Sequence, residues 1–314
     1  MEYEIIDVHL HLCKDTATEK VVYPRPGLPD SWRSGSPETL PKFMDFWGVS
    51  KVVSLNAMQH RRRVQDRLAR LPRGTSEAVY QSEKVRIQQE MVDSFRRFND
   101  WACDVSRSNP RIQVYVGIDP ILFGENTMAY FEDWVRKGTP GIKIHPGHIG
   151  ATPDHPTLMA IYQRCQELRL PVFFDSGTSG GHGPGGVVYG EPIHFIPVLS
   201  TFPRLKLLMA HFCSAYWDER VKLAARFKDN LFFDISGALY EPPDKTNARD
   251  GSRALSQEEA VRVFREVGVE RLMFGSEGQG QRLIADAEQI MRLDLTDAEK
   301  RLIFSENAKR IMGL

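Results

Sequence analysis

Short runs of apolar and β-branched residues recur along the chain, and each is followed by a stretch whose apolar positions have helical spacing. Eight of these runs are brief and flanked by Gly or Pro, which favours buried parallel strands. They lie at residues 4–9, 51–55, 112–118, 141–145, 171–175, 205–210, 231–235 and 271–275. Helices are predicted between them at residues 81–108, 126–137, 156–169, 192–201, 216–228, 256–267 and 281–292.

Eight strands alternating with helices predict an α/β protein with a closed (β/α)8 barrel, a TIM barrel, formed by one domain over residues 1–314. An open doubly wound sheet is the alternative. That fold normally has a glycine-rich phosphate loop after its first strand, where this chain has His9 and His11. Residues 14–42, which are rich in proline, are expected to form a long lid or insertion loop over the barrel mouth. Residues 293–314 are expected to form a helical tail packed outside the barrel.

Composition narrows the classes of function. The 314 residues carry 41 Lys plus Arg against 41 Asp plus Glu, which disfavours nucleic acid as the main partner because phosphate backbones are bound by surplus basic residues. No apolar run approaches the roughly 18 residues that a membrane-spanning helix needs. The four cysteines form no CxxC pair, and the first residues lack the pattern of a signal peptide, so a reducing cytoplasm is expected. The expected partner is a small-molecule substrate.

Ionisable residues cluster at the end of the first predicted strand. In (β/α)8 barrels the C-terminal ends of the strands meet at the active-site mouth. Asp7, His9 and His11 stand at alternate positions there, which predicts that their side chains face one side. Two imidazoles at this spacing can hold one divalent metal, and buried core histidines are the alternative.

Later strands end in further ionisable residues. Lys143 and His145 end the fourth strand, again two positions apart. A lysine that points into a barrel is desolvated, paired, carbamylated or used on a substrate anion, whereas a lysine on a frayed strand end extends outward. The remaining strand-end candidates are Asp175, His211, Ser276 and Glu277, and the seventh strand contains Asp234.

These residues resemble the metal-dependent amidohydrolase superfamily, in particular the amidohydrolase 2 branch that includes aminocarboxymuconate semialdehyde decarboxylase. The resemblance covers nearly the whole chain, through the motifs IDVHLHL, FNDW, IQVYVGIDP, GIKIHP, LLMAHF, MFGSE and ENAKRIMGL in that order. It implies a metal held by the His-x-His of strand one, a histidine ending strand five and an aspartate after strand eight, beside a strand-six histidine. His9, His11 and His211 match this pattern. Pairing of barrels into a homodimer through outer helices is a further expectation.

Two positions depart from the family pattern. Asp175 stands where a histidine is expected, and Glu277 stands where an aspartate is expected. Both still offer oxygen ligands, so the expected ligands are His9, His11, Asp175 and Glu277. This more anionic set suits zinc, the expected metal, and would also favour manganese or iron(II). His182 is a candidate replacement ligand, and a metal-free site is the alternative if neither substitute binds.

The resemblance leaves the activity open. The first expectation is a metal-dependent hydrolase of a lactone, an amide or a related ring, in which Glu277 transfers the proton of an activated water and His211 stabilises the oxyanion. Lys143 and His145 complete the catalytic candidates. The second is a non-oxidative decarboxylase or hydratase with His211 or Glu277 as the acid. The third is a barrel that has lost catalysis and only binds a ligand.

Residues that follow the strands are candidates for substrate binding. Arg61 belongs to the HRRR run after the second strand, which is either a fork for a substrate carboxylate or a solvated helical face. Phe98 and Trp101 are expected to pack between helix and barrel. The predicted substrate-binding residues are Arg61, His182, Trp217 and Tyr240.

Overall fold

The computed structural model describes residues 2–25, 27, 33–183, 186–212, 216–237, 255–278 and 280–314. Within this part of the chain, eight parallel strands form one sheet in the order β1-β2-β3-β4-β5-β8-β9-β10. Their bounds are β1 Ile5–Leu10, β2 Val49–Leu55, β3 Ile112–Gly117, β4 Ile142–Ile144, β5 Val172–Phe174, β8 Leu207–Met209, β9 Leu231–Asp234 and β10 Leu272–Met273. The Val8 amide donates to the carbonyl of Phe274, just after β10, at 2.9 Å. This bond brings β1 beside β10, and the predicted (β/α)8 barrel is confirmed.

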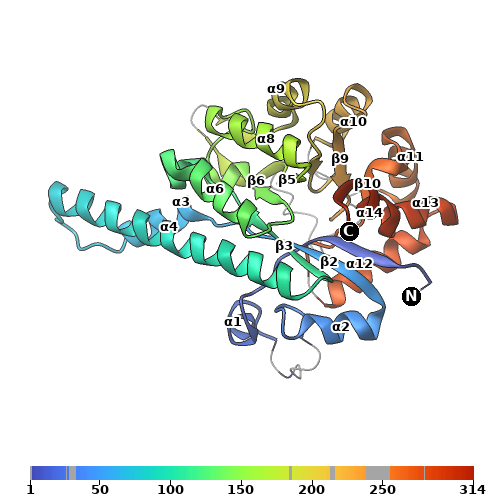
Figure 1. Cartoon of the computed structure of the whole chain (residues 1–314), viewed down its shortest axis with the longest axis horizontal. Coiled ribbons are helices and arrows are strands. Elements are labelled where there is room, and N and C mark those ends of the chain that lie inside the picture. Colours follow the sequence, from blue (N-terminus) through green and yellow to red (C-terminus); the bar gives the residue numbers. More distant parts are fainter. Residues whose placement is uncertain are drawn as a thin grey trace.

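Helices cover the outside of the barrel (Figure 1). Their bounds are α1 Thr16–Val22, α2 Leu40–Trp47, α3 His60–Leu68, α4 Glu77–Ser108, α5 Pro120–Phe123, α6 Thr127–Arg136, α7 Pro146–Ile149, α8 Pro156–Leu168, α9 Ile196–Thr201, α10 Trp217–Arg226, α11 Gln257–Val267, α12 Gln281–Arg292, α13 Asp297–Arg301 and α14 Asn307–Met312. In α11, Ser256 and Glu259 form a capping box, and buried residues recur with helical spacing behind it. Among the described residues, no helix combines the length and the apolar composition needed to cross a membrane.

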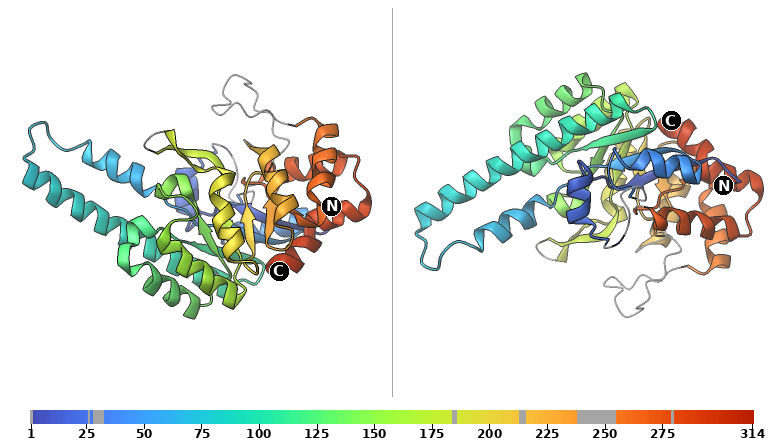
Figure 2. Two further views of the ribbon diagram at one scale, coloured as in Figure 1. Left: turned by 90° about the horizontal axis from the view of Figure 1, so that it is seen from above. Right: turned by 90° about the horizontal axis from the view of Figure 1, so that it is seen from below.

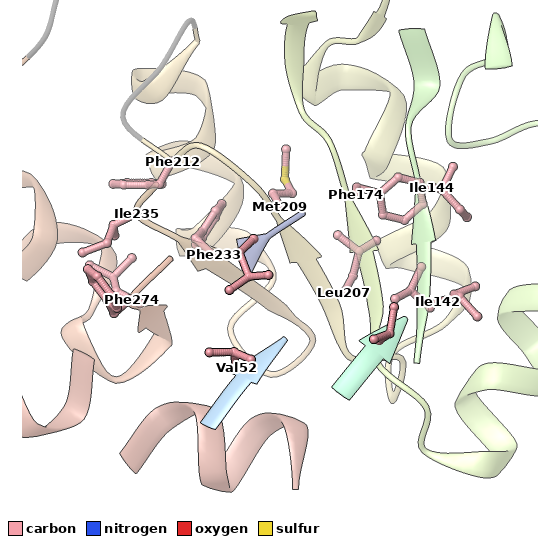
Figure 3. Packing of buried hydrophobic residues seen from close by; sticks show 14 of the residues in the cluster. Val52, Ile142, Ile144, Phe174, Leu207, Met209, Phe212, Phe233, Ile235 and Phe274 are labelled. Carbon is pink, nitrogen blue, oxygen red and sulfur yellow. The ribbon is translucent and has the colours of Figure 1, made fainter. Parts of the chain in front are cut away.

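Side chains along the strands divide between two buried layers. Phe174, Leu207 and Phe233 belong to the cluster that the strands share with the surrounding helices, and Figure 3 shows them coming from three strands. Their neighbours Phe173 and Phe232 belong to a second cluster, made mainly of strand residues inside the barrel. Burying one large apolar side chain contributes about 1.5–3 kcal/mol. The two layers therefore make a rigid support for the polar residues at the strand ends.

The C-terminal helix closes one end of the barrel interior. Ala308, Ile311 and Met312 on α14 are buried in the same cluster as Ile6 and Tyr115 from the strands. Their spacing places them on one helix face. The tail was expected to pack outside the barrel. Ile303 and Phe304 belong to the outer cluster shared with the helices, whereas the apolar face of α14 packs on the interior cluster.

Residues 14–42 contain more regular structure than the predicted loop. α1 begins after Asp15, whose side chain accepts a hydrogen bond from the Thr18 amide at 2.7 Å. α2 has Pro41 in its first turn. Proline content indicated a continuous loop, but the first turn of a helix tolerates proline because its N–H groups have no intrahelical acceptor. A lid role for this segment stays a prediction.

Two insertions extend the barrel rim. α3 and α4 pack against each other and project away from the barrel in both views (Figures 1 and 2). The HRRR run therefore begins a helix, as one of its two interpretations predicted. Residues 176–190 contain an antiparallel hairpin of β6 Gly177–His182 and β7 Val188–Gly190.

A fully buried arginine joins the loops that follow β5 and β8. Arg220 on α10 is 0% exposed. Its guanidinium donates to the carbonyls of His211 and Phe212 and, at 2.7 Å, to the carbonyl of Ser176. Because buried carbonyls need a donor, this side chain holds the two loops in a fixed relation.

Replacing Arg220 by methionine is expected to lower the free energy of unfolding by about 3 kcal/mol, because the change leaves several buried carbonyls without a donor. Urea denaturation of both proteins measures the difference. Lys222→Met on the same helix is the control, since the Lys222 side chain is 76% exposed. Equal stability of the Arg220 and Lys222 variants would show that the arginine is not a structural clamp.

Candidate active site

His9 is fully buried at the end of β1, and Asp234 from β9 fixes its ring. Nδ1 of His9 donates to Oδ2 of Asp234 at 2.8 Å, which leaves the ring lone pair on Nε2. Nε2 is buried and has no hydrogen-bond partner among the described residues. Gly275 makes the close approach feasible, because a Cβ there would lie 2.9 Å from Cβ of His9. A neutral imidazole supported by a carboxylate on its other nitrogen is typical of a metal ligand.

His11 is held in a similar way by the backbone. Its Nδ1 donates to the carbonyl of Leu55 at 2.9 Å. The rings of His9 and His11 meet edge to face, with centroids 5.2 Å apart. Burial lowers the pKa of His11 to about 3, and burial also lowers the pKa of His9. Both rings are therefore neutral at physiological pH, as metal coordination requires.

The strict alternation predicted for Asp7, His9 and His11 is wrong. The pairing of β1 with β2 shifts register between Asp7 and Leu10. Asp7 consequently lies apart from the two rings and accepts hydrogen bonds from the His9 amide at 2.9 Å and the Ser276 hydroxyl at 2.5 Å. Its role is to join the ends of β1 and β10, and the irregularity of β1 is what brings His9 to the site.

His211 follows β8 in a strained backbone conformation, with φ of 60°. Its Nδ1 lies 2.8 Å from Oγ of Ser236, and its Nε2 lies 3.4 Å from Oδ2 of Asp175 and 3.7 Å from Oε1 of Glu277. Burial alone would lower the pKa of His211, but the charges of Glu277 and Asp175 outweigh it and raise the pKa to about 9. The ring is therefore an imidazolium held between two carboxylates.

Glu277 shares the strained backbone of His211, with φ of 54°. Positive φ in residues other than glycine costs energy and concentrates at functional sites. The Glu277 amide donates to the carbonyl of His9 at 2.6 Å, which places the glutamate beside the histidine pair. Burial raises the pKa of Glu277, but the neighbouring histidines outweigh this effect and the pKa is lowered. The carboxylate is therefore ionised.

Asp175 connects His211 with a second histidine. Its Oδ2 lies 3.3 Å from Nε2 of His145, whose ring stacks on that of His148 with centroids 3.3 Å apart. Burial would raise the pKa of Asp175, but the adjacent His145 and His211 outweigh it and hold the pKa well below its usual range. Burial lowers the pKa of His145 to about 3. Asp175 is therefore ionised, and its positively charged partner is His211, because His145 is neutral.

Lys143 points into the barrel beneath these groups and is 1% exposed. Its Nζ lies 5.2 Å from the centre of the Phe173 ring and has no hydrogen-bond partner among the described residues. Burial lowers its pKa, against the opposing effect of nearby carboxylates such as Asp175. The outward-pointing alternative for this lysine is therefore wrong, and a catalytic role stays a prediction.

The donor atoms fit one divalent metal. His9, His211 and Asp234 offer ligand atoms that all lie within 4.8 Å of one another. Both oxygens of Asp234 already accept hydrogen bonds, from His9 on one side and from Ser236 on the other, so its fitting role is to orient His9. The buried Nε2 of His9, which has no hydrogen-bond partner among the described residues, is the atom to which a metal would bind. The other predicted ligands, His11, Asp175 and Glu277, line the cavity, and their coordination of a metal together with His9 stays a prediction.

The site opens into a cavity of about 840 Å³. His11, His145, Asp175 and Glu277 line the part of the cavity at the strand ends. The other walls include Thr18 and Tyr23 from the 14–42 segment, Arg63 from α3, and Arg97, Phe98 and Trp101 from α4. A cavity of this size is typical of a small-molecule site.

The two predicted substrate-binding residues whose side chains the structure describes, Arg61 and Trp217, do not line the cavity. Arg61 lies away from the lining, with its guanidinium 5.7 Å from the centre of the Tyr189 ring. Trp217 packs at the start of α10 against the hydrophobic core and is not among the lining residues. Tyr240 and the side chain of His182 lie outside the described residues.

Sequence reasoning missed several residues of the site. Asp234 was noted in its strand but assigned no role, although an aspartate in an apolar strand is itself a signal. Phe98 and Trp101 were expected to be packing residues, and they also line the cavity as a stacked pair with centroids 5.1 Å apart. Helical spacing predicts which residues share a face, but not that this face borders the mouth.

The barrel and its cluster of histidines and carboxylates define an enzyme of the amidohydrolase type. A model of the amidohydrolase family matches residues 6–314, and the chain belongs to this family. A comparison with curated proteins gives no match.

Several solved structures share the fold. An uncharacterised TIM-barrel protein from Bordetella bronchiseptica has 18% identity and a TM-score of 0.68, over 99% of this chain and 98% of that chain. For 2,6-dihydroxybenzoate decarboxylase from Rhizobium, identity is 15% and the TM-score 0.64, over 99% of both chains. For 5-carboxyvanillate decarboxylase from Novosphingobium aromaticivorans, solved with bound manganese, they are 15% and 0.62, over 100% of this chain and 98% of that chain.

Proposed function

We propose that this enzyme is a metal-dependent decarboxylase that removes a carboxylate from an aromatic acid without an oxidant. The observation that carries the proposal is the imidazolium of His211, held between Asp175 and Glu277, which both line the substrate cavity. It is a proton donor placed beside a metal-competent histidine pair. The similar structures that are decarboxylases support this activity better than the hydrolase first expected from the sequence.

One divalent metal would be held by His9 and His11 together with Glu277 or Asp175. When bound, the metal supplies a Lewis acid that neutralises the negative charge of the substrate's oxygen atoms. Zinc and manganese are the metals to compare, because the ligand set suits both and a decarboxylase of similar fold was solved with manganese.

The chain's own residues supply the proton that decarboxylation needs. When the bond between the ring carbon and the carboxylate breaks, carbon dioxide leaves, the electron pair stays on the ring carbon, and that carbon takes up one proton. Nε2–H of His211 donates this proton, while Nδ1–H donates to Ser236, whose hydroxyl donates in turn to Asp234. The neutral ring that remains regains its proton from water in the open cavity.

The cavity wall supports an aromatic substrate. Phe98 and Trp101 stack with an interplanar angle of 7° and line the cavity together with Met58. Aromatic rings contribute about 0.5–1.5 kcal/mol per pair beyond area burial when they stack or meet edge to face. A flat substrate ring can therefore be held here while its carboxylate reaches the histidine pair.

A panel of hydroxy-substituted aromatic acids tests the proposal. The purified protein, loaded with manganese or zinc, is expected to release carbon dioxide from at least one acid and, in deuterated water, to place one deuterium at the carbon that lost the carboxylate. Gas release and mass spectrometry measure the two products. Hydrolysis of lactones or amides by the same preparation, without carbon dioxide from any acid, would favour the hydrolase instead.

A further inference from the structure

We propose that the cavity has a second, anion-binding end formed by Arg63 and Arg97. The substrate is then an aromatic acid with another anionic group, a carboxylate or a similar oxyanion, on the side of the ring away from the group that is removed. This inference rests on the proposed function for the orientation of the substrate, because the first carboxylate is taken to lie at the histidine pair.

One face of α4 forms a wall of the cavity, and this wall has both aromatic and polar side chains. Ser94, Arg97, Phe98 and Trp101 all line the cavity and follow the spacing of a single helix face. α4 runs into β3, which begins at the closed end of the barrel, so residues earlier in α4 lie progressively further out. The stacked pair of Phe98 and Trp101 is therefore the deeper part of the wall, and Arg97 and Ser94 are its outer part.

Arg63 faces the same cavity from α3, whereas Arg61 does not. Successive residues of an α-helix are rotated by about 100° around its axis, so side chains two positions apart lie on nearly opposite sides of the helix. Arg61 accordingly lies by Tyr189 and Gly150, and Arg63 is among the cavity-lining residues with Arg97. Of the three arginines in the basic run that starts α3, only Arg63 lines the cavity.

The two arginines lack the ion pairs that their neighbours make. Arg62 pairs with Asp66 at 3.8 Å, and Arg67 pairs with Glu90 at 2.7 Å. No carboxylate in the described parts of the chain pairs with Arg63 or Arg97. The carboxylates that line the cavity, Asp175 and Glu277, lie at the strand ends instead. The cavity lining therefore combines metal-binding and acidic groups from the strand ends with guanidinium groups from α3 and α4.

The cavity also has room for more than a single substituted ring. A cavity of about 150 Å³ accommodates benzene, whereas this one has a volume of about 840 Å³. A longer acid fills more of it and carries its second charge toward the arginines, which bind carboxylates through two parallel N–H donors.

Binding of two matched pairs of probes tests this inference on the manganese-loaded protein. The pairs are benzoate with terephthalate, and biphenyl carboxylate with the biphenyl dicarboxylate that is charged at both ends. Titration calorimetry measures each Kd. In at least one pair the dianion is expected to bind about 10-fold or more tightly than the monoanion, since a hydrogen bond to a charged group contributes at least this factor.

The double variant Arg63→Met and Arg97→Met is expected to lose that advantage while its Kd for the monoanion stays unchanged. Arg62→Met is the matched control, because Arg62 lies on the same helix outside the cavity lining and its side chain is 77% exposed. It is expected to keep the full advantage. Thermal unfolding and metal content of each variant exclude loss of fold.

Three results would overturn the inference: no advantage of either dianion in the wild-type protein, an advantage that survives in the double variant, or no binding of any probe. Failure of the proposed function is distinguishable, because carbon dioxide release is measured separately. If the protein prefers dianions but decarboxylates no acid, the proposed arginine site is retained and the proposed decarboxylase activity is rejected. If the protein decarboxylates an acid but does not prefer dianions, the activity is retained and the arginine site is rejected.

Discussion

Replacing His211 by asparagine is expected to lower kcat for decarboxylation by about 10²–10⁴-fold, the range that a positioned proton donor contributes. Asparagine can keep the hydrogen bond that Nδ1 of His211 makes with Ser236, but it has no group that can donate the proton. Steady-state kinetics on an acid that the wild-type protein decarboxylates measures the effect. Metal content and thermal unfolding are expected to stay near the wild-type values, because the predicted ligands His9 and His11 are untouched.

The pH profile gives a second measurement of the same role. Asp175 and Glu277 raise the pKa of His211, so the donor form is present at low pH and is lost as the pH rises through that value, about 9. A bound metal acts in the opposite direction, because its positive charge disfavours the imidazolium. The alkaline limb of kcat is therefore expected at or below pH 9 in the wild-type protein and absent in His211→Asn. An asparagine variant with unchanged kcat would exclude His211 as the donor.

Much of the barrel could be predicted because brief buried strands have a distinctive composition. Runs such as those that became β5 and β9 are apolar on both sides, since one side packs on helices and the other fills the barrel. The strand-end rule then placed Asp175, His211 and Glu277 at one rim without any knowledge of their contacts.

The parts that could not be predicted depend on tertiary geometry. The register shift in β1 separates Asp7 from His9, and nothing in the alternating pattern marks it. The docking of α14 under the barrel depends on the space left by the interior side chains, and the contribution of Phe98 and Trp101 to the cavity depends on the angle of α4 against the rim. The spacing of apolar residues predicts which residues share a helix face, but tertiary packing decides what that face contacts.

Replacing His9 by asparagine is expected to reduce bound metal from about one equivalent to below about 0.1 and to abolish carbon dioxide release, because a buried ring nitrogen without another partner is removed. Mass spectrometry for metals measures the content. A ligand that binds only the native state stabilises it by about 2.7 kcal/mol at 100 times its Kd. A chelator should therefore lower the Tm of the wild-type protein and leave that of the variant unchanged. Full metal content in His9→Asn would mean that the centre lies elsewhere.

Asp234→Asn separates an orienting role from a ligating one. As an orienting residue, Asp234 fixes the ring of His9 through Nδ1, and the loss of its charge is expected to weaken metal affinity by about 10–100-fold, as for other carboxylates behind ligating histidines. Metal then returns when the concentration is raised in a competition titration with a chelator. If Asp234 were itself a ligand, the variant would behave like His9→Asn and stay empty over the same range. Because both its oxygens already accept hydrogen bonds, from His9 and from Ser236, the graded loss is the expected result.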